Sequence, residues 1–213
     1  MTDTLLQLLE SRYALSELDA GAFSSLKANG MTFTVKAYAA KGLGHVSLMK
    51  AKGFFGLMKM DTLMVVPFEK DLPLYSYDRI YAMGNDTLIV ELYDTLLAPL
   101  DLSALDRLNK AYSHLPERDA GKHWYDSIKL PQSLSKKSKK KDTPAFDKLA
   151  IEHFSLYLNA PASDVTDTEK KRMLSARYVN GLLTNGGPST DVFKKSLGEE
   201  ATASLFRNVL FGV

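Results

Sequence analysis

The sequence predicts an α+β domain in which helices pack on an antiparallel sheet. Strand-like segments joined by short turns fill most of residues 31–93, and helical patterns fill most of the chain after Pro99. Parallel strands need long crossover connections, so the short turns favour an antiparallel meander. The separation of strands from helices along the chain is typical of the α+β class.

The N-terminal half is expected to hold one helix and five strands. Residues 5–18 have leucines at helical spacing, and Asp19-Ala20-Gly21 follows as a stop signal. Alternating apolar and polar side chains and turn residues predict the strands. They are expected over residues 31–38, 45–50 and 57–66, and on both sides of a turn at Gly84-Asn85.

The C-terminal half is expected to be helical. Its apolar periodicity predicts helices over residues 103–112, 118–128, 144–158, 167–183, 189–197 and 199–211. The sequence Asn185-Gly186-Gly187-Pro188 ends the fourth of these, because glycine adopts the left-handed conformation at a helix end and proline cannot continue a helix.

Composition narrows the class of protein. The 213 residues suit one domain, residues 1–213, with 45% hydrophobic and 24% charged residues. The absence of cysteine excludes disulfides, thiolate nucleophiles and cysteine-bound metal centres. No apolar run reaches the roughly 18 residues that span a bilayer, and the N-terminus is acidic instead of a basic leader. We therefore expect a cytoplasmic protein without a membrane partner.

The net charge of +2 does not argue for a nucleic-acid partner, but the lysines cluster. Residues 135–141 read SKKSKKK, with five lysines in seven residues. Such a run either forms a solvated, mobile loop or docks an acidic protein or an anionic ligand. Nucleic acid is a weaker alternative, because no aromatic residues are interleaved with the lysines.

The familiar cofactor and catalytic motifs are absent. The chain has no GxGxxG, GxxxxGK[ST] or GxSxG sequence, and its four histidines lack the HExxH spacing. We expect no metal site. A redox enzyme of this kind would need a substrate that is itself the chromophore, or electrons from another protein.

The segment from Asp71 to Asp94 carries acidic groups into apolar surroundings. A carboxyl group among aromatic and aliphatic neighbours on a strand is costly to ionise. Such a group can therefore hold a proton near neutral pH and is a candidate proton donor.

Several segments, in the same order, resemble the ferredoxin-dependent bilin reductases, a family related to the red chlorophyll catabolite reductases. The strand-turn segment VPFEKDLPLYSYDRI and the strand IVELYD are similar to family segments. So are the Trp-x-x-x-Ile spacing of Trp124 and Ile128, and the C-terminal GPSTDVFKKSLGEEATASLFRNVLF. Together they run from about residue 60 to the end of the chain.

The resemblance implies a three-layer α/β/α sandwich, with a central antiparallel sheet flanked by helices. It also implies an oxidoreductase of phytobilin biosynthesis, which reduces CH–CH bonds of a linear tetrapyrrole such as biliverdin. Electrons would come from reduced ferredoxin, or flavodoxin, with no bound cofactor. A pocket carboxyl group would supply protons between the single-electron steps.

The resemblance also suggests site residues. By register the family's central-strand aspartate falls on Glu91, the expected proton donor, and alternation puts Asp94 on the opposite face unless a bulge intervenes. Glu69 matches an entry-strand glutamate, with a solvated turn residue as the alternative. His45 is either beside the substrate or a structural sheet residue.

The second family acid falls on Gly187, which has no side chain, so Asn185 and Asp191 are the nearest polar substitutes. Bilin propionates would meet cations, for which Arg79 and Lys194 are candidates. An acidic ferredoxin would dock on the lysines of residues 135–141. These are Lys136, Lys137, Lys139, Lys140 and Lys141.

Two other functions stay open. The glutamate in place of aspartate and the missing C-terminal acid favour a tetrapyrrole-binding protein without turnover. A reductase of chlorophyll catabolites, or of another open-chain tetrapyrrole, would keep the fold and change the substrate.

Overall fold

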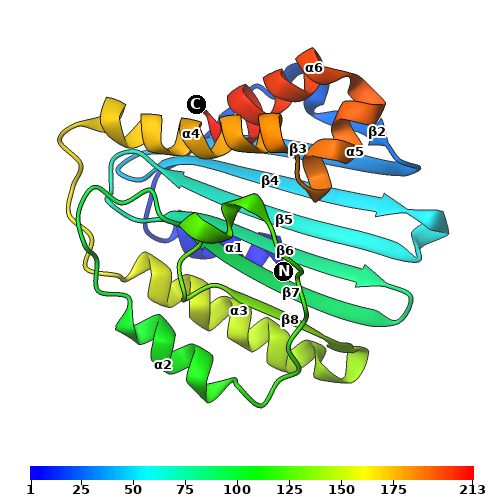
Figure 1. Ribbon diagram of the computed structural model, residues 1–213, viewed down its shortest axis with the longest axis horizontal. Coiled ribbons are helices and arrows are strands. Elements are labelled where there is room, and N and C mark those ends of the chain that lie inside the picture. Colours follow the sequence, from blue (N-terminus) through cyan, green and yellow to red (C-terminus); the bar gives the residue numbers. More distant parts are fainter.

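A computed structural model describes all residues 1–213 of the protein. A large antiparallel sheet forms the middle layer (Figure 1). Helices α1 (Thr2–Glu10), α2 (Ser103–Ala111) and α3 (Thr143–Leu158) cover one face. The other face is covered by α4 (Thr168–Asn185), α5 (Pro188–Leu197), α6 (Glu199–Ser204) and the π-helix η5 (Leu205–Phe211). The expected α/β/α sandwich is confirmed.

All neighbouring strands of the sheet are antiparallel, in the order β1-β3-β4-β5-β6-β7-β8, and β2 also pairs with β3. The predicted five-strand meander is present as β3 to β7. The strands are β1 Leu15–Leu18, β2 Ser25–Ala28, β3 Met31–Ala40, β4 Gly44–Gly53, β5 Met58–Pro67, β6 Leu74–Ala82, β7 Asn85–Tyr93 and β8 Leu134–Lys139.

Short 3₁₀ turns complete the chain: η1 (Gly21–Phe23), η2 (Phe54–Gly56), η3 (Trp124–Ile128) and η4 (Lys140–Asp142). The predicted stop after α4 is present, since Gly186 has φ 80°. None of the helices combines the length and apolar character needed to cross a bilayer.

Three local expectations were wrong. The first helix ends at Glu10, and residues 15–18 form β1, because they complete a ladder with residues 37–40 of β3. Residues 118–128 hold only the short turn η3. The lysine run is not a loop: β8 pairs with β7 from Asn85↔Lys139 to Val90↔Leu134. Local composition cannot show that β7 would otherwise be an open edge.

The pleat of the sheet divides the core into two clusters. On β6, Tyr75 and Tyr77 face α3 and are fully buried. Successive strand residues point to opposite faces, so Ser76 and Asp78 face the C-terminal helices instead. That second side is where a cavity remains.

Candidate functional site

A cavity of about 340 Å³ lies between the sheet and the C-terminal helices. Most of its lining is hydrophobic, and five methionines from β3, β4 and β5 form much of the sheet side: Met31, Met49, Met58, Met60 and Met64. Methionine adapts its shape to irregular ligands. Volume and lining are those of a small-molecule site.

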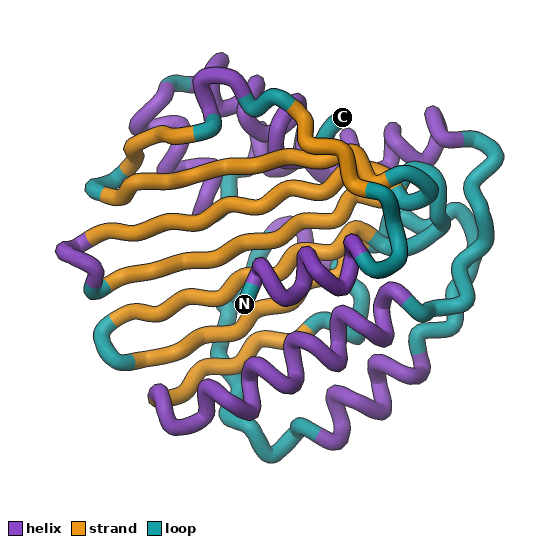
Figure 2. Tube along the Cα trace, turned by 180° about the vertical axis from the view of Figure 1, so that it is seen from behind, coloured by secondary structure: helices purple, strands orange, loops and turns teal.

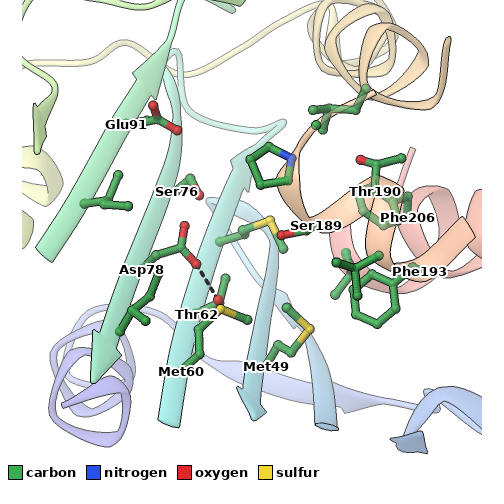
Figure 3. A pocket seen from close by; sticks show the side chains of 18 of the residues that line it. Met49, Met60, Thr62, Ser76, Asp78, Glu91, Ser189, Thr190, Phe193 and Phe206 are labelled. Carbon is green, nitrogen blue, oxygen red and sulfur yellow. Dashed lines mark hydrogen bonds between the residues drawn. The ribbon is translucent and has the colours of Figure 1, made fainter. Parts of the chain in front are cut away.

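Four polar side chains stand on the sheet side of this cavity: Thr62, Ser76, Asp78 and Glu91 (Figure 3). Asp78 on β6 lies opposite Thr62 on β5, and Ser76 lies opposite Glu91 on β7. Directly opposed residues of antiparallel strands share a face. The register therefore brings two carboxyl groups from adjacent strands onto one apolar surface.

Asp78 is held in a poorly solvated position. The hydroxyl of Thr62 donates a hydrogen bond to its Oδ1 at 2.5 Å. Burial raises the pKa of Asp78 to about 6, the Thr62 hydrogen bond opposes this increase, and the nearby charge of Glu91 adds to it. A large fraction of Asp78 therefore carries a proton at slightly acidic pH, and some of it does at neutral pH.

Glu91 has a different environment. The Tyr93 hydroxyl donates to its Oε2 at 2.6 Å, and Lys129 Nζ lies 3.6 Å from its Oε1. Lys129 also pairs with Asp126 at 2.8 Å. Glu91 thus joins the cavity to a chain of charged groups at the surface.

An aromatic wall adjoins Glu91. The rings of Tyr93 and Tyr178 stack at 4.1 Å between centroids, and Tyr125 meets Tyr93 edge-on at 5.7 Å. Trp124 buttresses this wall, since its Nε1 donates to the carbonyl of Gly186 at 2.9 Å. All three tyrosines line the cavity. Such a wall can stack on a flat conjugated ligand.

Arg118 supplies a cation to the cavity lining. Its backbone N–H donates to the carbonyl of Ser135 at 3.0 Å, and its guanidinium lies 3.4 Å from Ser135 Oγ. No carboxylate forms an ion pair with it. It is therefore able to receive an anionic group of a ligand.

Of the four catalytic candidates from the sequence, Glu91 alone lines the cavity. Glu69 is exposed and accepts from the N–H of Gly42 at 3.1 Å. Asp94 is exposed directly after β7 and does not line the cavity. His45 is buried, with Nε2 2.8 Å from the carbonyl of Val209, and burial lowers its pKa. It occupies the structural position that was the alternative.

The structure does not place Arg79, an expected substrate-binding residue, at the cavity. Its side chain is completely buried on the α3 side, where Nε donates to Asp86 Oδ1 at 2.5 Å. Asp147 of α3 lies 3.2 Å from its other end. Odd-numbered positions of β6 face away from the cavity, so the strand register prevents contact with a ligand there.

The C-terminal candidates lie around the α4–α5 connection and outside the lining. Asn185 and Asp191 are exposed, and Lys194 Nζ donates to the carbonyl of Leu183 at 2.5 Å. Gly187 does line the cavity, next to Ser189 and Thr190. This side of the cavity therefore offers hydroxyl groups and no carboxyl group.

The lysine run divides into one structural and four exposed residues. Lys136 is buried, donates to the carbonyl of Leu115 at 3.2 Å and pairs with Glu117, so it is not available for docking. The other four are exposed: Lys137, Lys139, Lys140 and Lys141. The pleat turned Lys136 inward, which composition alone could not show.

Asp78, Thr62, Arg118 and Tyr178 line the cavity but are not among the site residues expected from the sequence. The signal for Asp78 was present, because strand alternation sets it out of phase with Tyr75 and Tyr77. Asp78 faces the same side of the sheet as Ile89 and Glu91, and this follows only from the β6–β7 register. Tyr178 lies 85 residues after Tyr93 in the chain, so no local pattern could have paired the two. No group of three or more acidic or histidine side chains is positioned to hold a metal ion.

The protein is similar to a known protein in its structure, but its sequence matches no family model and no curated protein. The structure is similar to that of phytochromobilin synthase from tomato, solved in complex with biliverdin, with a TM-score of 0.72. The match covers 96% of this chain and 79% of that chain at 15% identity. This likeness shows that the two chains share a fold.

Proposed function

We propose that this protein reduces a linear tetrapyrrole of the biliverdin type, with electrons from reduced ferredoxin or flavodoxin. The observation that carries the proposal is a pair of carboxyl groups, Asp78 and Glu91, on adjacent strands of an otherwise apolar cavity. The shared fold with a protein solved with biliverdin supports the choice of substrate.

Reduction of one carbon–carbon double bond consumes two electrons and two protons. An external carrier supplies the electrons, so the cavity has to supply the protons. Asp78 is the stronger candidate for the first proton, because its pKa of about 6 lets it carry a proton near working pH and also release it. Thr62 orients its carboxyl group through the hydrogen bond to Oδ1.

Glu91 keeps the role of a second proton-transfer group. Its contacts with Tyr93 and Lys129 link the cavity to the surface, which suits a group that returns protons to the site after each transfer. The expected donor thus becomes one of two cooperating carboxyl groups.

The remaining lining suits the substrate class. The tyrosine wall stacks on conjugated pyrrole rings, the methionines adapt to a twisted chain of rings, and Arg118 pairs with a propionate. Lys137 and Lys139 alternate onto the same face of the sheet as the cavity, which places two exposed cations where an acidic electron carrier would approach.

A second candidate function is a tetrapyrrole carrier without turnover. The observation that favours it is the absence of a carboxyl group on the helical side of the cavity, where Gly187, Ser189 and Thr190 lie. A substrate protonated from one side only would be restricted in which double bond it could reduce.

The deciding experiment is an anaerobic absorbance time course with biliverdin, ferredoxin, ferredoxin reductase and NADPH. A reductase gives a shifted bilin spectrum that then converts to a new product. A shifted spectrum that stays unchanged favours the carrier. An unshifted spectrum with biliverdin excludes biliverdin as the substrate. A spectral shift with a chlorophyll catabolite in its place identifies the other substrate class.

Asp78→Asn tests whether Asp78 donates a proton in this reaction. Asp94→Asn, which changes a carboxyl group outside the cavity, is its control. We expect Asp78→Asn to bind biliverdin and to lower turnover by roughly 10²-fold or more, the usual contribution of a general acid. Wild-type turnover in Asp78→Asn would remove this residue from the mechanism.

A further inference from the structure

Two neighbouring hairpin turns carry large apolar side chains into solvent. The β4–β5 turn exposes Phe54 by 52%, Phe55 completely and Leu57 by 72%, and the β6–β7 turn exposes Met83 by 90%. Met58 pairs with Ala82, so the two turns are adjacent, at the left edge of the sheet in Figure 2. We name these four side chains the apolar tip.

The backbone of the tip adopts a conformation that is unfavourable for these residues. Phe54, Phe55 and Met83 have φ values of 52°, 54° and 50°. Glycine or asparagine occupies this left-handed region at less steric cost. Single exposed apolar residues are common, but four together at one edge indicate an interaction site.

Lysines surround the apolar tip on both faces of the sheet edge. This lysine collar consists of Lys27, Lys52, Lys59, Lys139, Lys140 and Lys141, all of them exposed. Lys52 lies directly opposite Lys59, an arrangement in which like charges repel. No member of the collar forms an ion pair.

Three acidic residues lie near this edge: Asp86 is buried against Arg79, Asp61 lies 4.0 Å from the N-terminal amine, and Asp142 accepts a hydrogen bond from Ser138. Asp142 is half-buried, and its single charge does not offset the six exposed lysines of the collar. Lys139 pairs in register with Asn85, two residues from Met83. The tip is therefore an apolar projection within a field of unpaired positive charge.

We propose that this edge of the sheet docks on an anionic lipid bilayer. The four apolar side chains would enter the interfacial region while the lysine collar contacts lipid phosphates. A bilayer is favoured over an acidic protein because the apolar groups project from two turns, whereas a protein partner buries apolar groups in a packed, complementary surface. The proposal concerns attachment to the bilayer surface and does not rest on the redox function, although Lys139 belongs both to the collar and to the face proposed for the electron carrier.

Docking would also bring the cavity close to the lipid. Asn29 and Met58, which lie at the same edge of the sheet as the apolar tip, both line the cavity. A hydrophobic ligand held there would lie near the membrane surface.

The test is co-sedimentation of the full chain with phosphatidylcholine vesicles, with and without phosphatidylglycerol. We expect binding to the anionic vesicles, roughly tenfold or more weaker binding to neutral vesicles, and loss of binding at high salt. No binding to the anionic vesicles would overturn the proposal.

Matched variants distinguish vesicle binding through the apolar tip from nonspecific hydrophobic adsorption. Phe55→Ser with Leu57→Ser should weaken binding by roughly tenfold or more, and Met173→Ser, which changes another exposed apolar residue, on α4, should have no effect. Lys52→Gln with Lys59→Gln keeps the apolar tip and should also weaken binding. Wild-type binding by both double variants would overturn the proposal.

Phe55→Trp reports insertion directly. We expect its added fluorescence to shift to the blue on anionic vesicles and to be quenched by brominated lipid. Vesicle binding without either signal would overturn insertion of the tip. Failure to bind vesicles, together with tip-dependent binding of an acidic protein, would also overturn the proposal and identify a protein interface instead.

Discussion

The two cavity carboxyl groups differ because of their nearest neighbours. Asp78 has one hydroxyl donor and otherwise apolar surroundings, whereas Glu91 has a tyrosine hydroxyl and a lysine within reach. Desolvation dominates at Asp78 and raises its pKa to about 6. Two carboxyl groups on adjacent strands are therefore suited to different tasks: Asp78 to donate protons and Glu91 to pass them on.

The raised pKa of Asp78 predicts a pH-dependent gain in stability for Asp78→Asn. The group titrates near 3.8 when unfolded and near 6 when folded, so the ionisation penalty on the folded state grows between pH 3.8 and pH 6 and is fully present above pH 6. We expect Asp78→Asn to increase the free energy of unfolding by at most about 3 kcal/mol at pH 8. The gain should vanish near pH 3.8.

Urea denaturation at several pH values measures this effect. Asp126→Asn is the control of opposite sign, because the Lys129 hydrogen bond lowers the pKa of Asp126 and its loss should destabilise the protein at pH 8. An equal effect of Asp78→Asn at pH 4 and pH 8 would contradict the assignment.

Glu91→Gln tests the second carboxyl group. The amide keeps the size and part of the hydrogen bonding of the side chain but cannot transfer a proton, so we expect bilin binding without completed turnover. Anaerobic spectroscopy should then show a stalled radical intermediate. Glu69→Gln, which changes an exposed carboxyl group, should turn over normally, and normal turnover by Glu91→Gln would remove Glu91 from the mechanism.

At the level of elements, the contact of α4 with η3 supports the aromatic wall. A methyl group on Gly181 would lie 2.2 Å from the Trp124 ring. We expect Gly181→Ala to lower stability by about 1–3 kcal/mol through overpacking, and to weaken bilin binding by moving Tyr125.

Thermal unfolding and bilin titration check this expectation. Arg177→Ala, at an exposed position of the same helix, is the control and should have little effect on either measurement. If Gly181→Ala matched the control, the close packing of Trp124 against α4 would be refuted.

A buried ion pair within the β6–β7 hairpin also contacts the start of α3. Arg79 bonds to Asp86 through two nitrogens at 2.5 and 2.7 Å, and Asp86 also accepts from Thr143 at 2.6 Å. Asp86→Asn removes the main negative partner of the buried Arg79 guanidinium, so we expect the free energy of unfolding to fall by about 3–5 kcal/mol.

Adding Arg79→Met to Asp86→Asn should recover part of that loss, because no buried cation remains unpaired. Urea denaturation of the single and double variants gives the coupling energy. A loss below about 1 kcal/mol in Asp86→Asn would show that the pair contributes little.

At the scale of the whole molecule, the cavity couples ligand binding to stability. A ligand that binds only the folded state, at one hundred times its dissociation constant, adds about 2.7 kcal/mol. For a chain of this size that corresponds to an increase in melting temperature of roughly 5–10 °C. We expect biliverdin to produce such an increase.

Ser76→Phe is the matched variant for this measurement. It places a ring between Asp78 and Glu91, so it should abolish the shift while leaving the unliganded protein folded. An unchanged shift in Ser76→Phe would place the ligand elsewhere on the molecule.

The sequence by itself determined the class of the fold and most of its elements. Alternation in β3 to β7, the short turns between them and the glycine stop after α4 are local signals, because they depend on residues close together in the chain. Glu91 was not such a local signal, because it was proposed for the cavity from the resemblance to a known family.

Only the tertiary structure decided which side chains share the site. Arg79 and Asp78 are sequence neighbours, yet the pleat sends one into the α3 core and the other into the cavity. Pairing with β7 turned the expected lysine loop into a strand, and packing of α4 brought Tyr178 onto Tyr93. These outcomes depend on contacts between distant segments, which local periodicity does not encode.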